Sequence, residues 1–336
     1  MHAFITGATG FLGKHVTQQL INQGWKVTAL CRDRSKLTHY PVPGIDWVQG
    51  KLQNIQSIRR AMPEKVDAVF HLAGDTTTWS LQHRRQYTTN VLGTQNVAKV
   101  ALEKRAIRFI HTSSIAVYGF HEDSVDEHSE MRGIDSPIAY FRSKYLAEEV
   151  IREHIKKGLD AVILNPAVIL GPHDQNNWIQ LFQKTKQDAL PATPPGKRSF
   201  CFAEDVAKAH IQAFVHGRCG ENYILSGPSA DLLQVCQWIA RRLGKPIPTH
   251  TMPAWLLKLT GFFSSILSHL TRKEPTISFE KAQIICASIE ASSEKAHREL
   301  QYRNSKTIEE MLEATYQWWI HQQAGDLLNL KNQDAA

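Results

Sequence analysis

Residues 3–13 read Ala-Phe-Ile-Thr-Gly-Ala-Thr-Gly-Phe-Leu-Gly. Ala3–Thr6 has the apolar character of a short strand, and Gly13–Gln23 has the apolar spacing of a helix. The three glycines of the stretch are Gly7, Gly10 and Gly13. Between a strand and a helix, such glycines allow a tight turn, a close approach of backbone to a pyrophosphate, and close packing of the helix on the strand. The stretch therefore predicts a dinucleotide-binding loop, with a purely structural turn as the alternative.

Short apolar runs alternate with helical patterns through the first half of the chain. This alternation predicts an α/β fold, with a Rossmann-type, doubly wound parallel sheet that carries helices on both faces. The further strands are expected at 26–31, 47–49, 68–72, 108–112 and 161–164, and the helices at 55–62, 91–103 and 140–156.

The pattern loosens after Gly171, where a smaller C-terminal part that binds substrate is expected. Asp205 is expected to cap the N-terminus of a helix, without a role in chemistry. The later elements are expected as helices at 205–214, 232–243, 253–270 and 308–322 and as a strand at 222–225.

The composition is that of a globular protein, since 42% of the 336 residues are hydrophobic. The net charge is +7, but basic residues come as singles and pairs and never as a run of five. We therefore expect no nucleic-acid partner. A solvated basic surface, or a positive field that attracts an anionic cofactor, accounts for the charge.

The five cysteines show neither a C-x-x-C pair nor zinc-ligand spacing, so no metal site and no disulfide framework are expected. Scattered thiols are typical of a reducing compartment, which predicts a cytoplasmic protein. The cysteines are Cys31, Cys201, Cys219, Cys236 and Cys286.

The longest apolar stretch is Trp255–Leu270, which Lys258 and His269 interrupt. It is short and polar for a transmembrane helix, so no stable membrane insertion is expected. A lid over a pocket, a core helix and a helix at a membrane surface all fit this segment. The first apolar run, at Ala3, is already a strand, so no signal peptide is expected.

The second expected strand ends in Cys31-Arg32-Asp33-Arg34. An acidic residue at the end of this strand usually binds the adenosine ribose of NAD. Arg32 follows the strand at once, and a guanidinium pairs well with a 2′-phosphate. The sequence therefore predicts NADP(H) rather than NAD. Two alternatives are a solvated loop and a shifted register in which Asp33 contacts the ribose.

Tyr140-Phe-Arg-Ser-Lys144 places a tyrosine and a lysine four residues apart, on one face of a helix. A free tyrosine has a pKa near ~10 and is a poor proton shuttle at neutral pH. A nearby ammonium favours the phenolate, so Lys144 is expected to lower the pKa of Tyr140. The lysine is also expected to hydrogen-bond the nicotinamide ribose.

These motifs together resemble the extended short-chain dehydrogenase/reductases, the NAD-dependent epimerase/dehydratase family. The glycine loop starts at Thr6, and the strand 109–114 resembles the one that carries the family's catalytic serine. The resemblance implies Ser114, with Ser113 as second choice, as the hydroxyl that orients the substrate oxygen. It implies Tyr140 as the proton donor and Lys144 as its partner. It covers residues 1–230 well and the tail loosely.

The resemblance also implies a set of cofactor contacts around the glycine loop and the strand ends. One departure is Lys51-Leu52, where the family often has Asp-Leu, so the Leu52 backbone is expected to serve. Asn90 fits either a group that organises the site or a kink. The implied cofactor contacts are Gly7, Thr9, Gly10, Phe11, Leu12, Gly13, Arg32, Leu52, Leu72, Ala73, Gly74, Tyr140, Lys144, Asn165 and Pro166.

Two features distinguish branches of the family. Ile115 and Ala116 stand where nucleotide-sugar 4,6-dehydratases carry an acidic pair. Asn165-Pro166 replaces the Arg-Pro of nucleotide-sugar epimerases. The pattern looks closer to dihydroflavonol 4-reductase and 3β-hydroxysteroid dehydrogenase. Trp79 either faces the substrate or lies in the core.

The expected function is an NADP(H)-dependent oxidoreductase that reduces a carbonyl, or oxidises a secondary alcohol, on a largely apolar small molecule. The alternatives are an NAD-dependent nucleotide-sugar epimerase and a non-catalytic NADP(H)-sensing protein. Residues 1–171 are expected to form the NADP-binding core, and 172–330 most of the substrate-binding part, with 200–226 returning to the core. A homodimer through the helices 91–103 and 140–156 would resemble the family.

Overall fold

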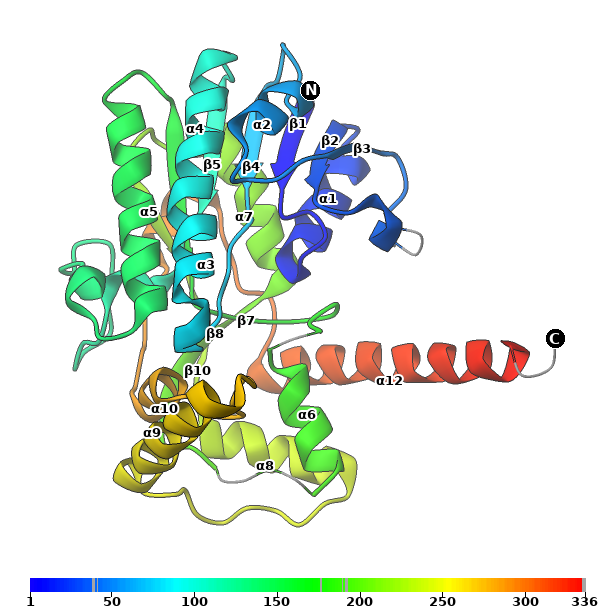
Figure 1. Ribbon diagram of the computed structural model, residues 1–336, viewed down its shortest axis with the longest axis vertical. Coiled ribbons are helices and arrows are strands. Elements are labelled where there is room, and N and C mark those ends of the chain that lie inside the picture. Colours follow the sequence, from blue (N-terminus) through cyan, green and yellow to red (C-terminus); the bar gives the residue numbers. More distant parts are fainter. Residues whose placement is uncertain (38–39, 41, 176, 189, 191–192, 334–336) are drawn as a thin grey trace.

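The main feature of the molecule is a seven-stranded, fully parallel sheet (Figure 1). The computed structural model describes residues 1–333 apart from 38–39, 41, 176, 189 and 191–192. The strand order confirms the doubly wound α/β prediction, and it reverses between β1 and β4, which is where such sheets bind ligands. In spatial order the strands are β3 (Ile45–Gln49), β2 (Lys26–Cys31), β1 (His2–Thr6), β4 (Ala68–His71), β5 (Arg108–Thr112), β6 (Ala161–Pro166) and β9 (Asn222–Leu225).

Helices cover both faces of this sheet, and each face has its own apolar core. Side chains of α1 and α7 join one core, and those of α2, α4 and α5 join the other, because alternate residues of buried strands point to opposite faces. The helices are α1 (Phe11–Asn22), α2 (Ile55–Ala61), α3 (His83–Tyr87), α4 (Gly93–Glu103), α5 (Ala139–Ile155), α7 (Ala203–His216) and α11 (Glu294–Leu300).

A smaller part lies at the other end of the molecule from the N-terminus (Figure 1). Its three-stranded sheet has the order β10-β8-β7, with β7–β8 parallel and β8–β10 antiparallel. A third core, rich in aromatic side chains, joins this sheet to α6, α8 and α12. The elements are β7 (Val168–Leu170), α6 (Ile179–Lys186), β8 (Lys197–Phe202), β10 (Ser229–Asp231), α8 (Leu232–Leu243), α9 (Ala254–Thr271), α10 (Phe279–Cys286) and α12 (Ile308–Gln333).

Two local predictions need correction. Helix α7 begins at Ala203, with Phe202 at the cap position, so Asp205 is not the N-cap. Its carboxylate instead accepts hydrogen bonds from the backbone N–H (2.7 Å) and hydroxyl (2.6 Å) of Ser305. The helix expected at 91–103 is preceded by a π-helical turn at Thr88–Leu92, from which α4 continues.

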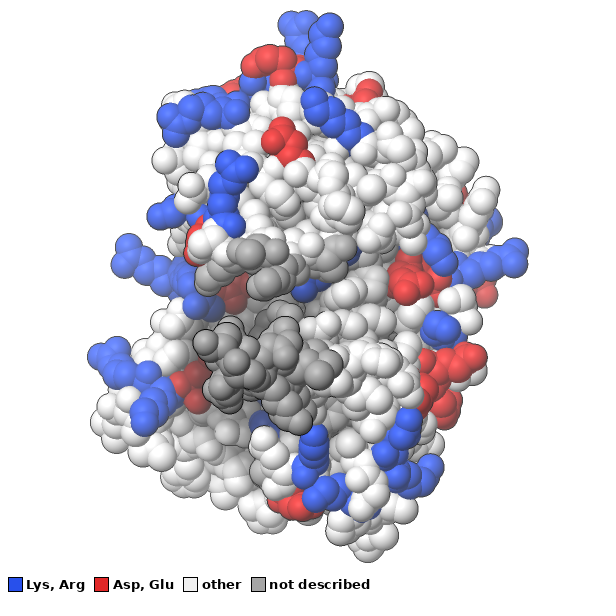
Figure 2. Space-filling view, turned by 90° about the vertical axis from the view of Figure 1, so that its right-hand side faces the viewer, with Lys and Arg blue, Asp and Glu red and all other residues white. Residues whose placement is uncertain are grey.

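The surface carries charges of both signs. On the face seen in Figure 2, Lys and Arg side chains are interspersed with Asp and Glu. Among the residues that the structure describes, no helix combines the length and hydropathy needed to cross a bilayer.

Candidate active site

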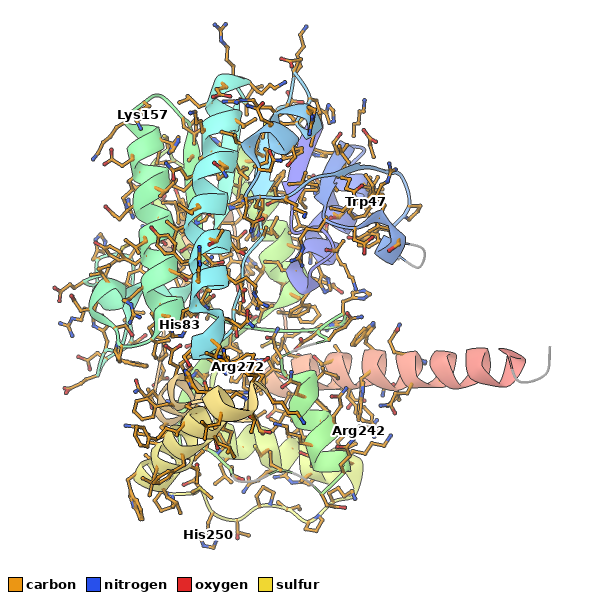
Figure 3. The ribbon with its side chains drawn as sticks, in the orientation of Figure 1. Trp47, His83, Lys157, Arg242, His250 and Arg272 are labelled. Carbon is orange, nitrogen blue, oxygen red and sulfur yellow. The ribbon has the colours of Figure 1, made fainter. Side chains whose placement is uncertain are left out.

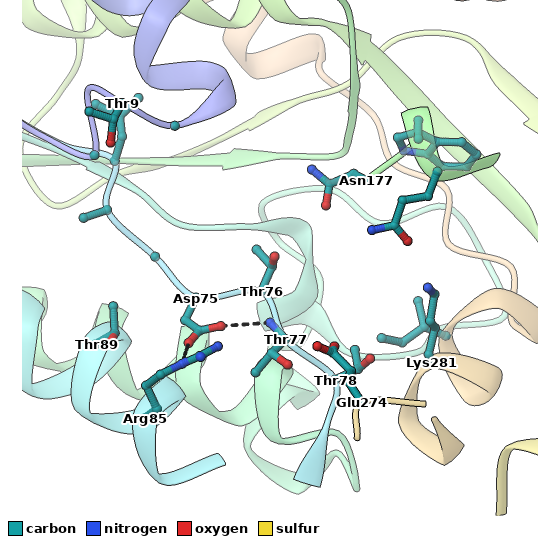
Figure 4. A pocket seen from close by; sticks show the side chains of 18 of the residues that line it. Thr9, Asp75, Thr76, Thr77, Thr78, Arg85, Thr89, Asn177, Glu274 and Lys281 are labelled. Atoms are coloured by element: carbon teal, nitrogen blue, oxygen red, sulfur yellow. Dashed lines mark hydrogen bonds and ion pairs between the residues drawn. The ribbon is translucent and has the colours of Figure 1, made fainter. Parts of the chain in front are cut away.

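A cavity of about 1220 Å³ follows the carboxyl ends of β1, β2 and β4 and continues into the smaller part. This is the crevice that an open α/β sheet offers to a ligand where its strand order reverses. One end is lined by the residues that follow the strands, including Gly7, Gly10 and Leu72. The other end is lined by residues of α6, α8 and α10 and is seen from close by in Figure 4.

The glycine loop is packed too tightly for side chains. A Cβ on Gly13 would lie 2.0 Å from the Gly7 carbonyl oxygen, and a Cβ on Gly7, whose φ is +79°, would lie 2.6 Å from the backbone nitrogen of Ala73. Gly10 is the N-cap residue of α1, and no side chain fills the cap. Free amides at a helix start, in a cradle that a Cβ would fill, fit a pyrophosphate.

The predicted loop residues divide into two groups. Gly7, Thr9 and Gly10 line the cavity. Phe11 and Leu12 begin helix α1 instead, where Leu12 is buried in the core between helix and sheet.

Beyond the glycine loop, where β2 and β3 end, the cavity is lined by Arg32, Leu52 and residues around them. Arg32 is exposed, so its guanidinium is accessible to a ligand. The Asp33 carboxylate accepts hydrogen bonds from the backbone N–H (3.0 Å) and the hydroxyl (2.7 Å) of Ser35. Asp33 is thus engaged in the following turn, which leaves Arg32 as the charged group that lines this end.

Asn90 connects the segment after β4 to helix α5. Its Oδ1 accepts from the Asp75 N–H at 2.7 Å, while its Nδ2 donates to the Asp75 carbonyl at 2.9 Å and to the Ser143 hydroxyl at 2.9 Å. It lies in the π-helical turn, and such turns are frequent at functional sites. Asn90 is therefore both part of a helix irregularity and a positioning residue for Leu72, Ala73 and Gly74, which line the cavity.

Ser114 and Tyr140 come from two neighbouring elements, strand β5 and helix α5. Tyr140 lies in the first turn of α5, Ser114 follows β5, and the Ser114 hydroxyl comes close enough to Tyr140 to lower its pKa. The Ser113 hydroxyl is buried and has no hydrogen-bond partner among the described residues. The structure therefore favours Ser114 over Ser113 as the hydroxyl that acts with Tyr140.

Lys144 is almost fully buried, and its Nζ donates to the carbonyl of Thr112 at 2.7 Å. Burial lowers the pKa of Lys144 to about 8, which the carboxylate of Glu148 partly opposes. Burial raises the pKa of Tyr140, and the Ser114 hydroxyl partly opposes that rise. The expected lowering of the Tyr140 pKa is thus not observed, because desolvation is the largest influence and Lys144 bonds to Thr112.

The Lys144 pKa has a measurable consequence for activity. Below about pH 8 the amine carries a charge, and above that pH it loses the charge, because burial disfavours the ammonium. We expect kcat/KM, which reports groups of the free enzyme, to fall as pH rises through about 8. A pH–rate profile checks this, with Lys144→Arg moving the fall to higher pH. A flat profile to pH 9.5 would contradict the assignment.

Two buried histidines, His71 and His111, lie near Lys144, and no sequence motif indicated a role for them. His71 hydrogen-bonds Thr6 at 2.7 Å and Thr94 at 2.9 Å, and it stacks on His111 with ring centres 5.6 Å apart. Burial, and then Lys144, lower the pKa of His71 to about 3 and that of His111 well below its ordinary value. Both rings are therefore neutral at physiological pH, so Lys144 is the cation of this cluster.

Asn165 lies behind Ser114 and not in the cavity. Its fully buried Nδ2 donates to the Ser114 carbonyl (3.2 Å) and to Glu148 (2.6 Å), and its Oδ1 accepts from Asn222 (2.8 Å). Because every polar atom of this side chain has a protein partner, it positions Ser114 and is not a side-chain contact for a cofactor. Pro166 ends the same buried strand.

The end of the cavity next to α6, α8 and α10 is lined by both apolar and polar side chains. Two half-buried amines, Lys184 and Lys281, also line it, and burial lowers the pKa of each. Trp79 does not line it; its buried indole donates to Ser268 at 3.0 Å, which favours the core interpretation. The apolar lining includes Trp178, Leu181, Leu190, Pro194, Leu232, Ile277, Ile284 and Ile285.

Besides Lys184, the charged groups that line this end are Asp75, Arg85, Glu274 and Lys281, which Figure 4 shows around three threonines. Asp75 and Arg85 form an ion pair at 2.7 Å. No group of three or more metal-binding side chains exists among the residues that the structure describes.

Comparisons with known proteins agree with this geometry. A Synechocystis sp. protein named as a dihydroflavonol 4-reductase is 29% identical over 328 residues, which are 95% of this chain and 94% of that protein. Sterol demethylase protein B of Methylococcus capsulatus is 27% identical, over 89% of this chain and 93% of that one. The crystal structure of gox2253 superposes with a TM-score of 0.80 at 27% identity, and the match covers 95% of this chain and 98% of that one.

A model of the NAD dependent epimerase/dehydratase family matches residues 3–226, about two thirds of the chain. The match includes the glycine loop, Arg32, Ser114, Tyr140 and Lys144. The chain therefore belongs to the NAD-dependent epimerase/dehydratase family, as its motifs predicted, and is an enzyme of the kind that binds a nicotinamide cofactor.

Proposed function

We propose that the protein is an NADP(H)-dependent oxidoreductase that reduces a carbonyl, or oxidises a secondary alcohol, on a largely apolar small molecule. The observation that carries the proposal is the approach of the Ser114 hydroxyl, which follows β5, to Tyr140 in the first turn of α5. Neither side chain is among the residues that line the cavity. The apolar lining of the substrate end supports an apolar substrate. The names of the reductase and sterol relatives point in the same direction.

A bound nicotinamide supplies the hydride, and the chain supplies position and a proton. In the reducing direction Tyr140 donates its phenolic proton to the carbonyl oxygen, while Ser114 hydrogen-bonds and orients that oxygen. The raised pKa of Tyr140 keeps the donor protonated at neutral pH. Lys144, whose Nζ donates to the Thr112 carbonyl, would hold the nicotinamide ribose. Asn90 fixes α5 relative to the segment after β4.

The preference for NADP(H) is proposed on Arg32. A guanidinium that pairs with a 2′-phosphate contributes about 1.5–3 kcal/mol when well formed, so Arg32→Ala is expected to weaken NADPH binding by about tenfold or more. NADH has no 2′-phosphate, so its affinity should change little. Parallel fluorescence titrations of NADPH and NADH measure both effects.

Arg60→Ala is the matched control, since Arg60 is exposed on α2 and lies outside the cavity lining. Preference of the wild type for NADH, or an equal effect of Arg32→Ala on both nucleotides, would refute the role of Arg32. Cofactor that stays bound through purification, with activity on nucleotide sugars, would favour the epimerase alternative instead.

A further inference from the structure

Helix α9 exposes an apolar side to solvent. Its buried residues form one stripe, Leu257, Gly261 and Ser268, and this stripe packs on α10 and Trp79. The opposite side is apolar and exposed. Its exposed side chains are Trp255 (67%), Leu259 (43%), Phe262 (46%), Phe263 (60%), Ile266 (48%), Leu267 (58%) and Leu270 (78%).

These seven side chains form one continuous face. At about 100° per residue they fall within an arc of about 140°, with no polar residue inside it. Lys258 and His269 border the arc on one side, and Thr260 and Thr271 border it on the other. A monomer in water rarely exposes so large a contiguous apolar surface, and such surfaces mark a site of interaction.

The chain segment that contains α9 is basic, although Arg242 and Lys245 pair with Glu313 and Asp188 and Glu274 follows the segment directly. The segment 232–273 contains no Asp or Glu. Its basic residues are Arg241, Arg242, Lys245, Lys258, Arg272 and Lys273. Figure 3 shows Arg242, His250 and Arg272 in the same part of the molecule as α9. An apolar face with basic residues around it complements an anionic lipid surface, where basic residues attract headgroups and apolar residues enter the boundary with the acyl chains.

We propose that α9 docks the enzyme on the surface of a membrane that contains anionic lipids, with the helix axis in the plane of the interface. The helix does not span the bilayer, in agreement with its length and hydropathy. The proposal concerns where the enzyme acts and stands whichever cofactor the enzyme uses.

Docking through α9 also places the substrate cavity next to lipid. Gly261 allows α10 to approach closely, since a Cβ on it would lie 2.9 Å from Ala282 Cβ. Ile284 and Ile285 of α10, and Pro275 and Ile277 between the two helices, line the cavity. Helix α10 therefore lies between α9 and the cavity. An apolar substrate that is dissolved in the bilayer would have only a short distance to travel from the membrane surface to the cavity.

The test is co-sedimentation of the full-length protein with vesicles, either equimolar phosphatidylcholine and phosphatidylglycerol or phosphatidylcholine alone. Wild type is expected to bind the anionic vesicles more tightly. The variant Phe263→Ser/Leu267→Ser/Leu270→Ser removes three of the four most exposed apolar side chains of α9 and is expected to reduce partitioning at least about 100-fold. Lys258→Gln, Arg272→Gln and Lys273→Gln are each expected to cost about fivefold on anionic vesicles only, and less at high salt.

The control is Ile107→Ser/Val215→Ser, which removes two equally exposed apolar side chains (63% and 58%) from the large-sheet part. Unchanged melting temperature and NADPH affinity show that each variant is folded. Three outcomes would overturn the proposal: wild type that does not bind vesicles, a triple variant that binds as wild type does, or a dimer in solution that the triple variant dissociates. The last outcome would identify α9 as an interface between two copies.

Discussion

Tyr140→Phe is expected to lower kcat for carbonyl reduction by about 10²–10⁴-fold, because it removes only the proton that the tyrosine donates. The ring keeps its place at the start of α5, and no cofactor phosphate depends on the hydroxyl. NADPH affinity, measured by fluorescence titration, should therefore stay close to that of the wild type. Steady-state rates with a panel of ketones and aldehydes give the loss in turnover.

The serine pair beside Tyr140 provides the matched control. Ser114→Ala removes the hydroxyl that lies close to Tyr140 and is expected to lower kcat by a similar order. Ser113→Ala removes a buried hydroxyl that has no partner among the described residues, so its effect should be small. Full turnover by Tyr140→Phe would show that the proton comes from another group. A larger loss from Ser113→Ala than from Ser114→Ala would show that Ser113 is the hydroxyl that orients the substrate oxygen.

Gly13→Ala is expected to abolish nucleotide binding and to destabilise the fold by more than about 3 kcal/mol. Its Cβ would lie 2.0 Å from the Gly7 carbonyl oxygen and 2.8 Å from the Ala8 Cα, so backbone must move. Overpacking against flexible side chains costs about 1–3 kcal/mol, and rigid backbone cannot adjust as side chains do. The movement displaces the amides at the start of α1 that face the phosphates. Urea unfolding and NADPH titration measure the two losses.

Gly24→Ala tests the other end of the same helix. Gly24 has φ +76°, but no atom lies within 4 Å of its would-be Cβ. The substitution should cost only the strain of a left-handed conformation, about 1–2 kcal/mol, and leave nucleotide affinity unchanged. Equal effects of the two substitutions on NADPH affinity would mean that the glycine loop does not form the phosphate site.

Most of the large sheet was predictable, because its strands other than the exposed edge strand β3 are largely buried and form short apolar runs between turns. The strands of the smaller sheet did not have that signal. Strand β8 starts Lys197-Arg198, and Arg198 is almost fully buried. Its guanidinium donates to the carbonyls of Ile284 and Ala287. A buried arginine held by distant carbonyls has no local signature, so the strand could not be recognised.

The candidate site shows the same division. Tyr140, Lys144 and Ser114 were predictable because the chemistry fixes residue types at local spacings. The partners of Asn90 and Asn165 are separated from them along the chain, so spacing says nothing about those hydrogen bonds. The direction of the Tyr140 pKa shift depends on burial, which a local motif does not encode. Sequence therefore predicts the reacting groups, and the fold decides their surroundings.

The interleaved path of the chain restricts how the molecule can move. The chain passes from the large sheet to the small one at Ala167 and returns at Phe202, and it leaves β9 for β10 through residues 226–228. A hinge motion between two parts of a protein usually occurs at a few residues in the connections between them. Here several short connections tie the halves, so wide opening about a single hinge is disfavoured. Substrate exchange should instead depend on small local movements of the segments around α9 and α10.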